Sequence, residues 1–170
     1  FIFYFLYKKA EPSQLRGKLE IAILNGNLPD LKQLVKSGAD LNALSKDGGS
    51  PLSSAAFHGR LEHVRFLLQK GADATKRNRD GGTPLHVAAL MGRFEIAKLL
   101  LSKGGDANVR NKKGESSIDA VSGEWSDGVA GFYAFLNGLT SNKVDLQEIR
   151  KTRPHMVKLL KRGPKATLPL

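Results

Sequence analysis

The sequence predicts an all-α solenoid, a stack of similar helix-turn-helix units, and two observations support this prediction. The first is a period of 33 residues, which places Leu19, Leu52 and Leu85 in equivalent positions. The second is the recurrence of apolar residues at helical spacing, between glycines suited to helix ends. The period also relates Gly26 to Gly59 and Gly92, Ala22 to Ala55 and Ala88, and the triplet 38–40 to 71–73 and 104–106.

The first helix of each regular unit has a signature at its start. Ser50 and Thr83 can cap the helix through their hydroxyl oxygens, and Pro51 and Pro84 fit the first turn, where a missing N–H is tolerated. Small residues come next, which lets this short helix lie close to its neighbours. A glycine suited to left-handed geometry follows, and then a second helix completes the pair.

A polar segment connects one helix pair to the next. Within the segments 42–49 and 75–82, the dipeptides Asp47-Gly48 and Asp80-Gly81 predict tight turns, so each segment should project and return as a finger. We therefore expect no extended sheet beyond finger hairpins. The expected helices cover 15–25, 28–37, 51–58, 61–70, 84–91 and 94–103.

Two short motifs connect this pattern with a known family. The segments TPLHVA at 83–88 and GADLN at 38–42 resemble the most diagnostic motif and the closing motif of the ankyrin repeat. The resemblance covers roughly residues 15–138 and implies four units, of which the first is an N-terminal cap and the fourth departs from the pattern. The implied repeats are about 15–47, 48–80, 81–113 and 114–138, and the structural motif residues are Thr83, Pro84, Leu85, His86 and Gly92.

The sequence becomes less regular toward its end. The aromatic segment 132–136 lies 33 residues after the end of the third unit's second helix, so it is expected in the second helix of the fourth unit. Two further helical segments predict a degenerate pair that caps the stack, because the end of a solenoid needs a modified unit. The ranges are 144–151 and 154–162 for this pair, 139–163 for the capping region and 164–170 for the tail.

The aromatic residues near the end leave two interpretations open. Trp125, Phe132, Tyr133 and Phe135 either pack the cap or form a binding patch. Helical spacing at the end of a solenoid favours packing. Trp125 is the residue for which a binding role stays open.

Residues 1–14 form an apolar and basic N-terminal segment. The segment FIFYFLY at 1–7 precedes Lys8 and Lys9, and it is too short to span a bilayer, which needs about 20 residues. We interpret it as the remnant of a longer anchor or signal, or as a strand or stray terminus. If it ends a spanning helix, the lysines place the following domain in the cytoplasm.

The composition excludes several kinds of site. The chain of 170 residues contains no cysteine, which excludes disulfides, thiolate metal sites and a cysteine nucleophile within it. Its formal net charge of +11 favours acidic partners or surfaces. The histidines lack the spacing of a zinc site, and no glycine-rich phosphate loop is present. We predict no catalytic residue, no metal and no cofactor.

His86 lies beside hydroxyl residues, which raises the question of catalysis. A catalytic histidine needs an activated nucleophile and a group that orients the ring. The equivalent positions hold Ser53 and Asp119, which can replace a structural hydrogen bond but not a catalytic base. The resemblance implies that His86 bonds neighbouring turns and orders the stack.

The fingers are the main candidates for binding a partner. Their tips carry a basic ridge, consisting of Lys46, Lys76, Arg77, Arg79, Arg110, Lys112 and Lys113. The predicted function is non-catalytic binding of another protein, whose surface is acidic, through finger tips and concave first helices. The predicted partner-binding residues are Lys46, Ser54, His58, Lys76, Arg77, Asn78, Arg79, Leu90, Arg110 and Lys112.

Two alternatives remain. One is electrostatic binding to nucleic acid or an anionic membrane, although the ridge lacks the aromatic residues that stack on bases. The other is an accessory module of a larger membrane-anchored or enzymatic protein.

Overall fold

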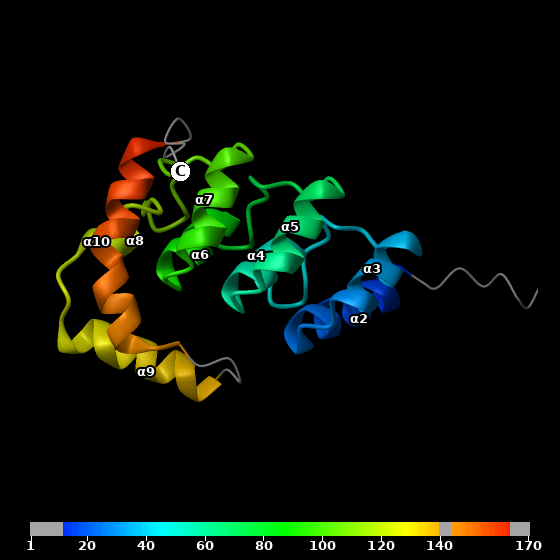
Figure 1. The fold of residues 1–170 in the computed structure, drawn as a ribbon, viewed down its shortest axis with the longest axis horizontal. Coiled ribbons are helices and arrows are strands. Elements are labelled where there is room, and N and C mark those ends of the chain that lie inside the picture. Colours follow the sequence, from blue (N-terminus) through cyan, green and yellow to red (C-terminus); the bar gives the residue numbers. More distant parts are fainter. Residues whose placement is uncertain (1–11, 140–143, 164–170) are drawn as a thin grey trace, which may run out of the picture.

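The computed structural model describes residues 12–139 and 144–163 as a row of stacked helices (Figure 1). The expectations for the segment 1–7 and the tail 164–170 lie outside these residues. All six helices predicted for the first three units are confirmed, and no strand occurs in the described part of the chain. These helices are α2 (Pro12–Asn25), α3 (Leu28–Lys36), α4 (Pro51–Phe57), α5 (Leu61–Gln69), α6 (Pro84–Leu90) and α7 (Phe94–Ser102).

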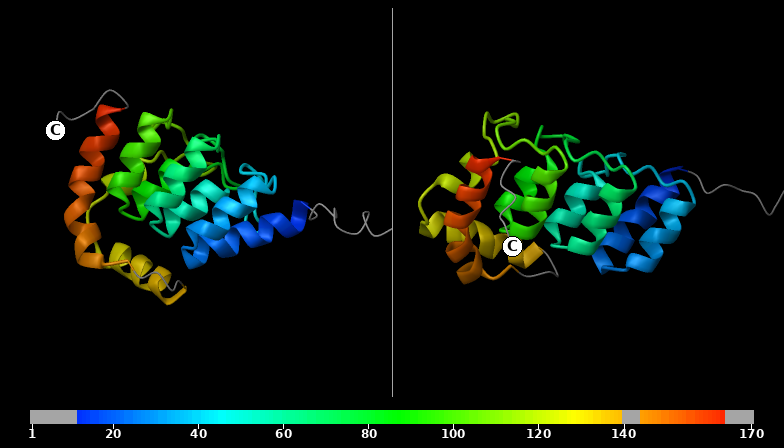
Figure 2. Two further views of the ribbon diagram at one scale, coloured as in Figure 1. Left: turned by 45° about the vertical axis from the view of Figure 1, so that its right-hand side comes forward. Right: turned by 45° about the horizontal axis from the view of Figure 1, so that its top comes forward.

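The helices form two layers. The first helices of successive units, α2, α4 and α6, contact one another, and the second helices α3, α5 and α7 form the other layer (Figure 2). Leu19, Leu52 and Leu85, which the period relates, are each at most 1% exposed. The repeated apolar position is therefore the centre of the core, and each unit buries it against its neighbours.

Local capping explains where the short helices begin. The Ser50 hydroxyl oxygen accepts a hydrogen bond from the Ser53 amide at 3.1 Å, and the Asn27 side chain accepts one from the Asp30 amide at 3.1 Å. Both bonds satisfy an amide that has no partner inside its helix. Gly59, with φ of 65°, turns the chain from α4 into α5 in a conformation that disfavours a side chain.

The fourth unit differs from the sequence-based expectation. Its first helix, α8 (Asp119–Ser122), has four residues and extends the layer of α6. The helix that follows in register, α9 (Asp127–Leu139), does not continue the second layer; α10 (Leu146–Arg162) contacts α7 and α8 and takes that place. The period correctly predicted a helix at 132–136 but not its position in the stack.

The reason lies in the faces of the two helices. α10 presents Ile149, Met156 and Leu160, all at most 3% exposed, opposite a charged face, so it fits a position covered on one side. α9 carries no charged residue after Asp127. α9 therefore lacks the charged outer face that a position in the second layer requires, and it lies below α6 instead, where its Tyr133 packs in one cluster with Met91 (Figure 1).

The predicted pair of capping helices is also wrong. Residues 146–162 form one continuous helix, α10, with Pro154 inside it. Pro154 is exposed, so the carbonyl that loses its helical hydrogen bond can be hydrated. A proline signals the end of a helix in most sequences, but here the buried residues on both sides hold the helix together.

Candidate functional site

The fingers are bonded to one another through their backbones. Each closes on itself with two backbone hydrogen bonds, which in the second finger run from the Asn78 amide to the Gly82 carbonyl at 2.8 Å and from the Gly81 amide to the Asn78 carbonyl at 3.0 Å. The Arg79 amide donates to the Gly48 carbonyl at 3.1 Å, and the Lys112 amide donates to the Asp80 carbonyl at 2.8 Å. The three fingers therefore form one continuous edge.

The arginines of the basic ridge belong to this framework. The Arg79 guanidinium donates to the Lys46 carbonyl at 2.9 Å, and that of Arg77 donates to the Arg110 carbonyl. Arg110 itself donates to the Gly114 carbonyl and to the Asp119 carboxylate, the latter at 3.1 Å. Arg77 and Arg79 thereby connect neighbouring fingers, and Arg110 connects the third finger to α8, while all three side chains remain exposed.

The other predicted finger residues divide into two groups. The Asn78 side chain accepts hydrogen bonds from the amides of Asp80 at 3.0 Å and Gly82 at 2.8 Å, so it holds the turn. Lys46 and Lys112 are exposed, and Lys76 is half-buried. These lysines supply positive charge along the fingers without the cross-finger contacts of the arginines.

His86 bridges the third and fourth units. Its Nδ1 accepts a hydrogen bond from the Thr83 amide at 3.1 Å and lies 2.9 Å from the Thr83 hydroxyl oxygen. The ring proton is then on Nε2, which donates to the Glu115 carbonyl at 3.2 Å. Burial lowers the pKa of His86, and the neutral ring meets both partners. This arrangement ties a helix start to the next finger.

The residues equivalent to His86 make simpler versions of this contact. The Ser53 hydroxyl oxygen accepts a hydrogen bond from the Ser50 hydroxyl at 3.1 Å, and the Ser53 amide donates to the same Ser50 hydroxyl oxygen. The Asp119 carboxylate accepts bonds from the Ser116 amide at 2.9 Å and the Ser116 hydroxyl at 2.8 Å. These bonds, with a contribution from the Arg110 charge, lower the pKa of Asp119. All three positions accept a hydrogen bond at a helix start, which is a structural task.

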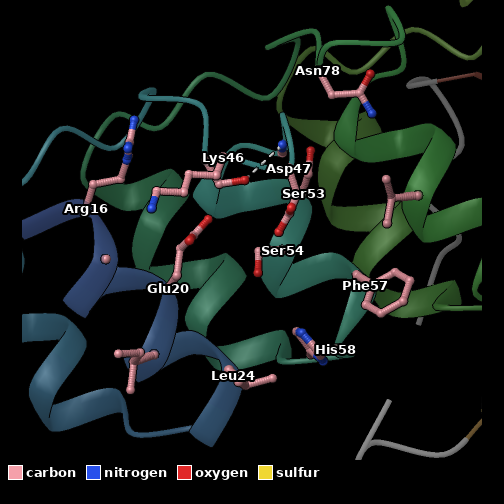
Figure 3. Close-up of a pocket in the computed structure, with 15 residues that line it drawn as sticks. Arg16, Glu20, Leu24, Lys46, Asp47, Ser53, Ser54, Phe57, His58 and Asn78 are labelled. Carbon is pink, nitrogen blue, oxygen red and sulfur yellow. Dashed lines mark hydrogen bonds between the residues drawn. The ribbon is translucent and has the colours of Figure 1, made fainter. Parts of the chain in front are cut away.

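A groove of about 1120 Å³ lies on the concave side, between α2, α4 and the first two fingers (Figure 3). Ser54 and His58, which the sequence predicted as partner-binding, line it together with Phe57. From the opposite wall, α2 contributes Ile21, 58% exposed, and Leu24, 43% exposed. Its charged lining residues are two of each sign: Arg16, Glu20, Lys46 and Asp47.

Sequence reasoning missed the apolar wall of this groove. The period places Ile21 at the position of Ser54, and it places Leu24 and Phe57 at the position of Leu90. Applying the period to the predicted binding residues would therefore have found all three. The prediction omitted them because it favoured charged and polar residues at the finger tips.

The third unit's part of the concave face is covered by α9. Leu90, predicted to bind a partner, packs with Trp125 and Tyr133, and its carbonyl accepts a hydrogen bond from the Tyr133 hydroxyl. Tyr133 is fully buried, and burial raises the pKa of its hydroxyl. Leu90 thus joins a core cluster instead of an open surface.

The aromatic segment is only partly core. Trp125 stacks on Tyr133 with ring centroids 5.9 Å apart, and Arg153 lies 5.9 Å from the Trp125 ring. Phe132 and Phe135 are 41% and 65% exposed. The packing interpretation holds for Trp125 and Tyr133, while the two phenylalanines face outward.

Two arginines, Arg60 and Arg93, lie near the groove residue His58, and Arg60 also bonds the backbone of the groove residue Leu24. The Arg60 guanidinium lies over Gly26 and donates to the Leu24 carbonyl at 2.9 Å; that of Arg93 lies over Gly59. In the described part of the chain, no carboxylate lies within 4.0 Å of either, and the Nε atoms of both are buried without a hydrogen-bond partner. Burial lowers the pKa of the neighbouring His58, and both arginines lower it further.

The described residues contain neither a cluster of metal-binding side chains nor a helix suited to span a membrane. No group of three or more His, Asp or Glu side chains there could hold a metal ion. None of the helices described has the length and apolar character needed to cross a membrane.

Paired helices with projecting fingers and a lined concave groove define a repeat solenoid, the class of protein that presents a rigid surface built from consecutive units. The family model described as ankyrin repeats (3 copies) matches residues 19–111, and the chain belongs to the ankyrin repeat family. The match ends before α8, where the regular stacking ends. No curated protein matches the chain. Ankyrin repeats are generally modules of protein–protein interaction and are typically non-catalytic.

Proposed function

We propose that this protein binds another protein on the concave face of its first two units, and that the basic ridge increases the association rate of an acidic partner. The observation that carries the proposal is the open groove lined by Ile21, Leu24 and Phe57. Large apolar side chains exposed together in a concave surface are characteristic of interaction sites. The partner-binding role of Ser54 and His58 is part of this proposal.

The fingers contribute through charge. Lys46 lines the groove and Lys112 lies on the third finger, both exposed. Rim charges act mainly on the association rate and on its dependence on salt. The predicted binding roles of Arg77, Arg79 and Arg110 are proposed in the same electrostatic sense, because all three guanidinium groups already make hydrogen bonds within the protein, those of Arg77 and Arg79 to neighbouring fingers and that of Arg110 to Gly114 and Asp119.

The test is crosslinking in the source cell. A photoreactive amino acid at Ser54, inside the groove, should capture a defined partner, whereas the same amino acid at Gln69, exposed on α5, should not. Equal capture at both positions, or none at Ser54, would contradict binding at the concave face.

A charge test addresses the ridge separately. Replacing Lys46 and Lys112 with glutamate should slow association of the captured partner, and more so at low salt, while dissociation changes little. Coinciding plots of association rate against salt for the wild type and this variant would exclude the ridge as a steering element.

A further inference from the structure

The concave face of the third unit is already covered by a helix of the same chain, α9. In the core cluster around Tyr133, α9 packs Tyr133, Val129 and Leu136 against Leu90 and Met91 of the third unit. Leu24 and Phe57 occupy the positions in the first two units that Leu90 occupies in the third. The same surface therefore continues beyond α9, and there it is open.

The open part has room for a second helix. The stretch of α2 from Arg16 to Leu24 that lines the groove is about 12 Å long at 1.5 Å per residue, which corresponds to two to three helical turns. Phe57 lines this groove and also packs against the cluster that holds α9. An occupant on Ile21 and Leu24 would thus extend an interface that exists in the fold.

The charges at the His58 end of the groove favour an acidic occupant. Near the fingers, the lining charges are balanced, two of each sign. At the other end, Arg60 and Arg93 flank His58 with no carboxylate within 4.0 Å in the described residues. Half-buried cations that lack a counter-charge are costly, and an incoming carboxylate would remove part of this cost.

We propose that the groove between α2 and α4 binds an acidic amphipathic helix of the partner protein. Its apolar side packs on Ile21, Leu24 and Phe57, and a carboxylate lies beside His58 and Arg93. This inference rests on the proposed function and specifies the chemistry of the partner segment. An amphipathic helix is recognised in a groove through apolar anchors at helical spacing on the bound helix, and here these anchors would contact Ile21, Leu24 and Phe57.

The probe is a labelled peptide of about 16 residues, with leucines at positions i, i+3, i+4 and i+7 and glutamate or alanine elsewhere. Its control has lysine in place of each glutamate. Fluorescence anisotropy with the full chain should give a Kd at least about tenfold lower for the glutamate peptide. Equal affinity for both peptides, or no binding of the glutamate peptide, would overturn the proposal.

Variants locate the peptide on the surface. Leu24→Glu, at an exposed position, should weaken binding about tenfold, and Arg93→Gln about fivefold. Arg65→Gln is the matched control, because Arg65 is an exposed arginine on α5 paired with Glu62 at 3.3 Å. It should change the Kd less than about twofold. Equal losses for Arg93→Gln and Arg65→Gln would mean nonspecific attraction, and unchanged binding by Leu24→Glu would place the peptide elsewhere; either result overturns the proposal.

Two further measurements keep the outcome interpretable. Circular dichroism establishes that each variant folds, and His58→Glu adds a negative charge at the same end without altering an arginine, so it should also weaken binding. Crosslinking from Ser54 in the source cell does not depend on the peptide. Capture of a partner together with failure of the glutamate peptide would reject the acidic helix and leave the proposed function standing.

Discussion

Replacing His86 with alanine should destabilise the protein by about 2 kcal/mol, because the substitution leaves a buried amide without an acceptor. Thr83 is 3% exposed, so its amide cannot turn to water when Nδ1 is removed. A buried donor left unpaired costs about 1–3 kcal/mol. The bond from Nε2 to Glu115 adds less, because the Glu115 carbonyl also accepts from the Asn111 amide at 2.9 Å.

The variant His86→Asp separates the two contacts. Aspartate occurs at the equivalent position of the fourth unit, where it accepts the amide of Ser116. It should restore the acceptor for Thr83 but not the bond to Glu115, so most of the lost stability should return. Urea unfolding followed by circular dichroism measures both variants against the wild type. A loss below about 0.5 kcal/mol for His86→Ala, or equal losses for the two variants, would refute this reasoning.

Three further predictions concern stability. Burial lowers the pKa of His63 from 6.5, so the folded state binds a proton there less readily than the unfolded state. The free energy of unfolding should therefore fall as the pH drops below about 6.5. His63→Ile, which copies Ile96 of the next unit, should make this fall shallower in urea titrations at several pH values. Gly59→Ala should cost more than Gly71→Ala, by at most about 1 kcal/mol. Both glycines have positive φ, but a Cβ at Gly59 would lie 2.8 Å from the guanidinium carbon of Arg93, which would have to shift, whereas Gly71 has open space. Equal losses would contradict the close approach. Pro154→Ala should raise the free energy of unfolding by about 1 kcal/mol or more, since it restores a helical N–H, and an unchanged Tm would show that the proline causes no strain in α10.

The first three units could be predicted closely because their signals are local. A hydroxyl residue before Pro51 or Pro84, a glycine such as Gly59 and the apolar spacing between them determine where each helix begins and ends. Each of these features acts within a few residues. The period then gives the stacking, since equivalent residues such as Leu19 and Leu52 occupy equivalent positions in the core.

The end of the stack could not be predicted in the same way. The register places 132–136 in a helix but does not say which surface that helix covers. The second layer is instead continued by α10, whose contacts with α7 and α8 depend on residues far along the chain. The finger arginines show the same limit. Their basic character is visible in the sequence, but the bond from Arg79 to the Lys46 carbonyl depends on how two fingers stack. Leu90 was assigned to the partner surface for the same reason, because its cover comes from a distant segment.

The position of α9 has a consequence for how the chain folds. Contacts between adjacent ankyrin units can form step by step, each new unit packing on the one before it. The contact between Tyr133 and Leu90 spans 43 residues, and α10 reaches α7 only after the chain has passed through α9. Closing such a loop costs more chain entropy than adding a neighbouring unit, so contact order rises at this end of the molecule. We therefore expect the last two helices to dock after the regular units have formed.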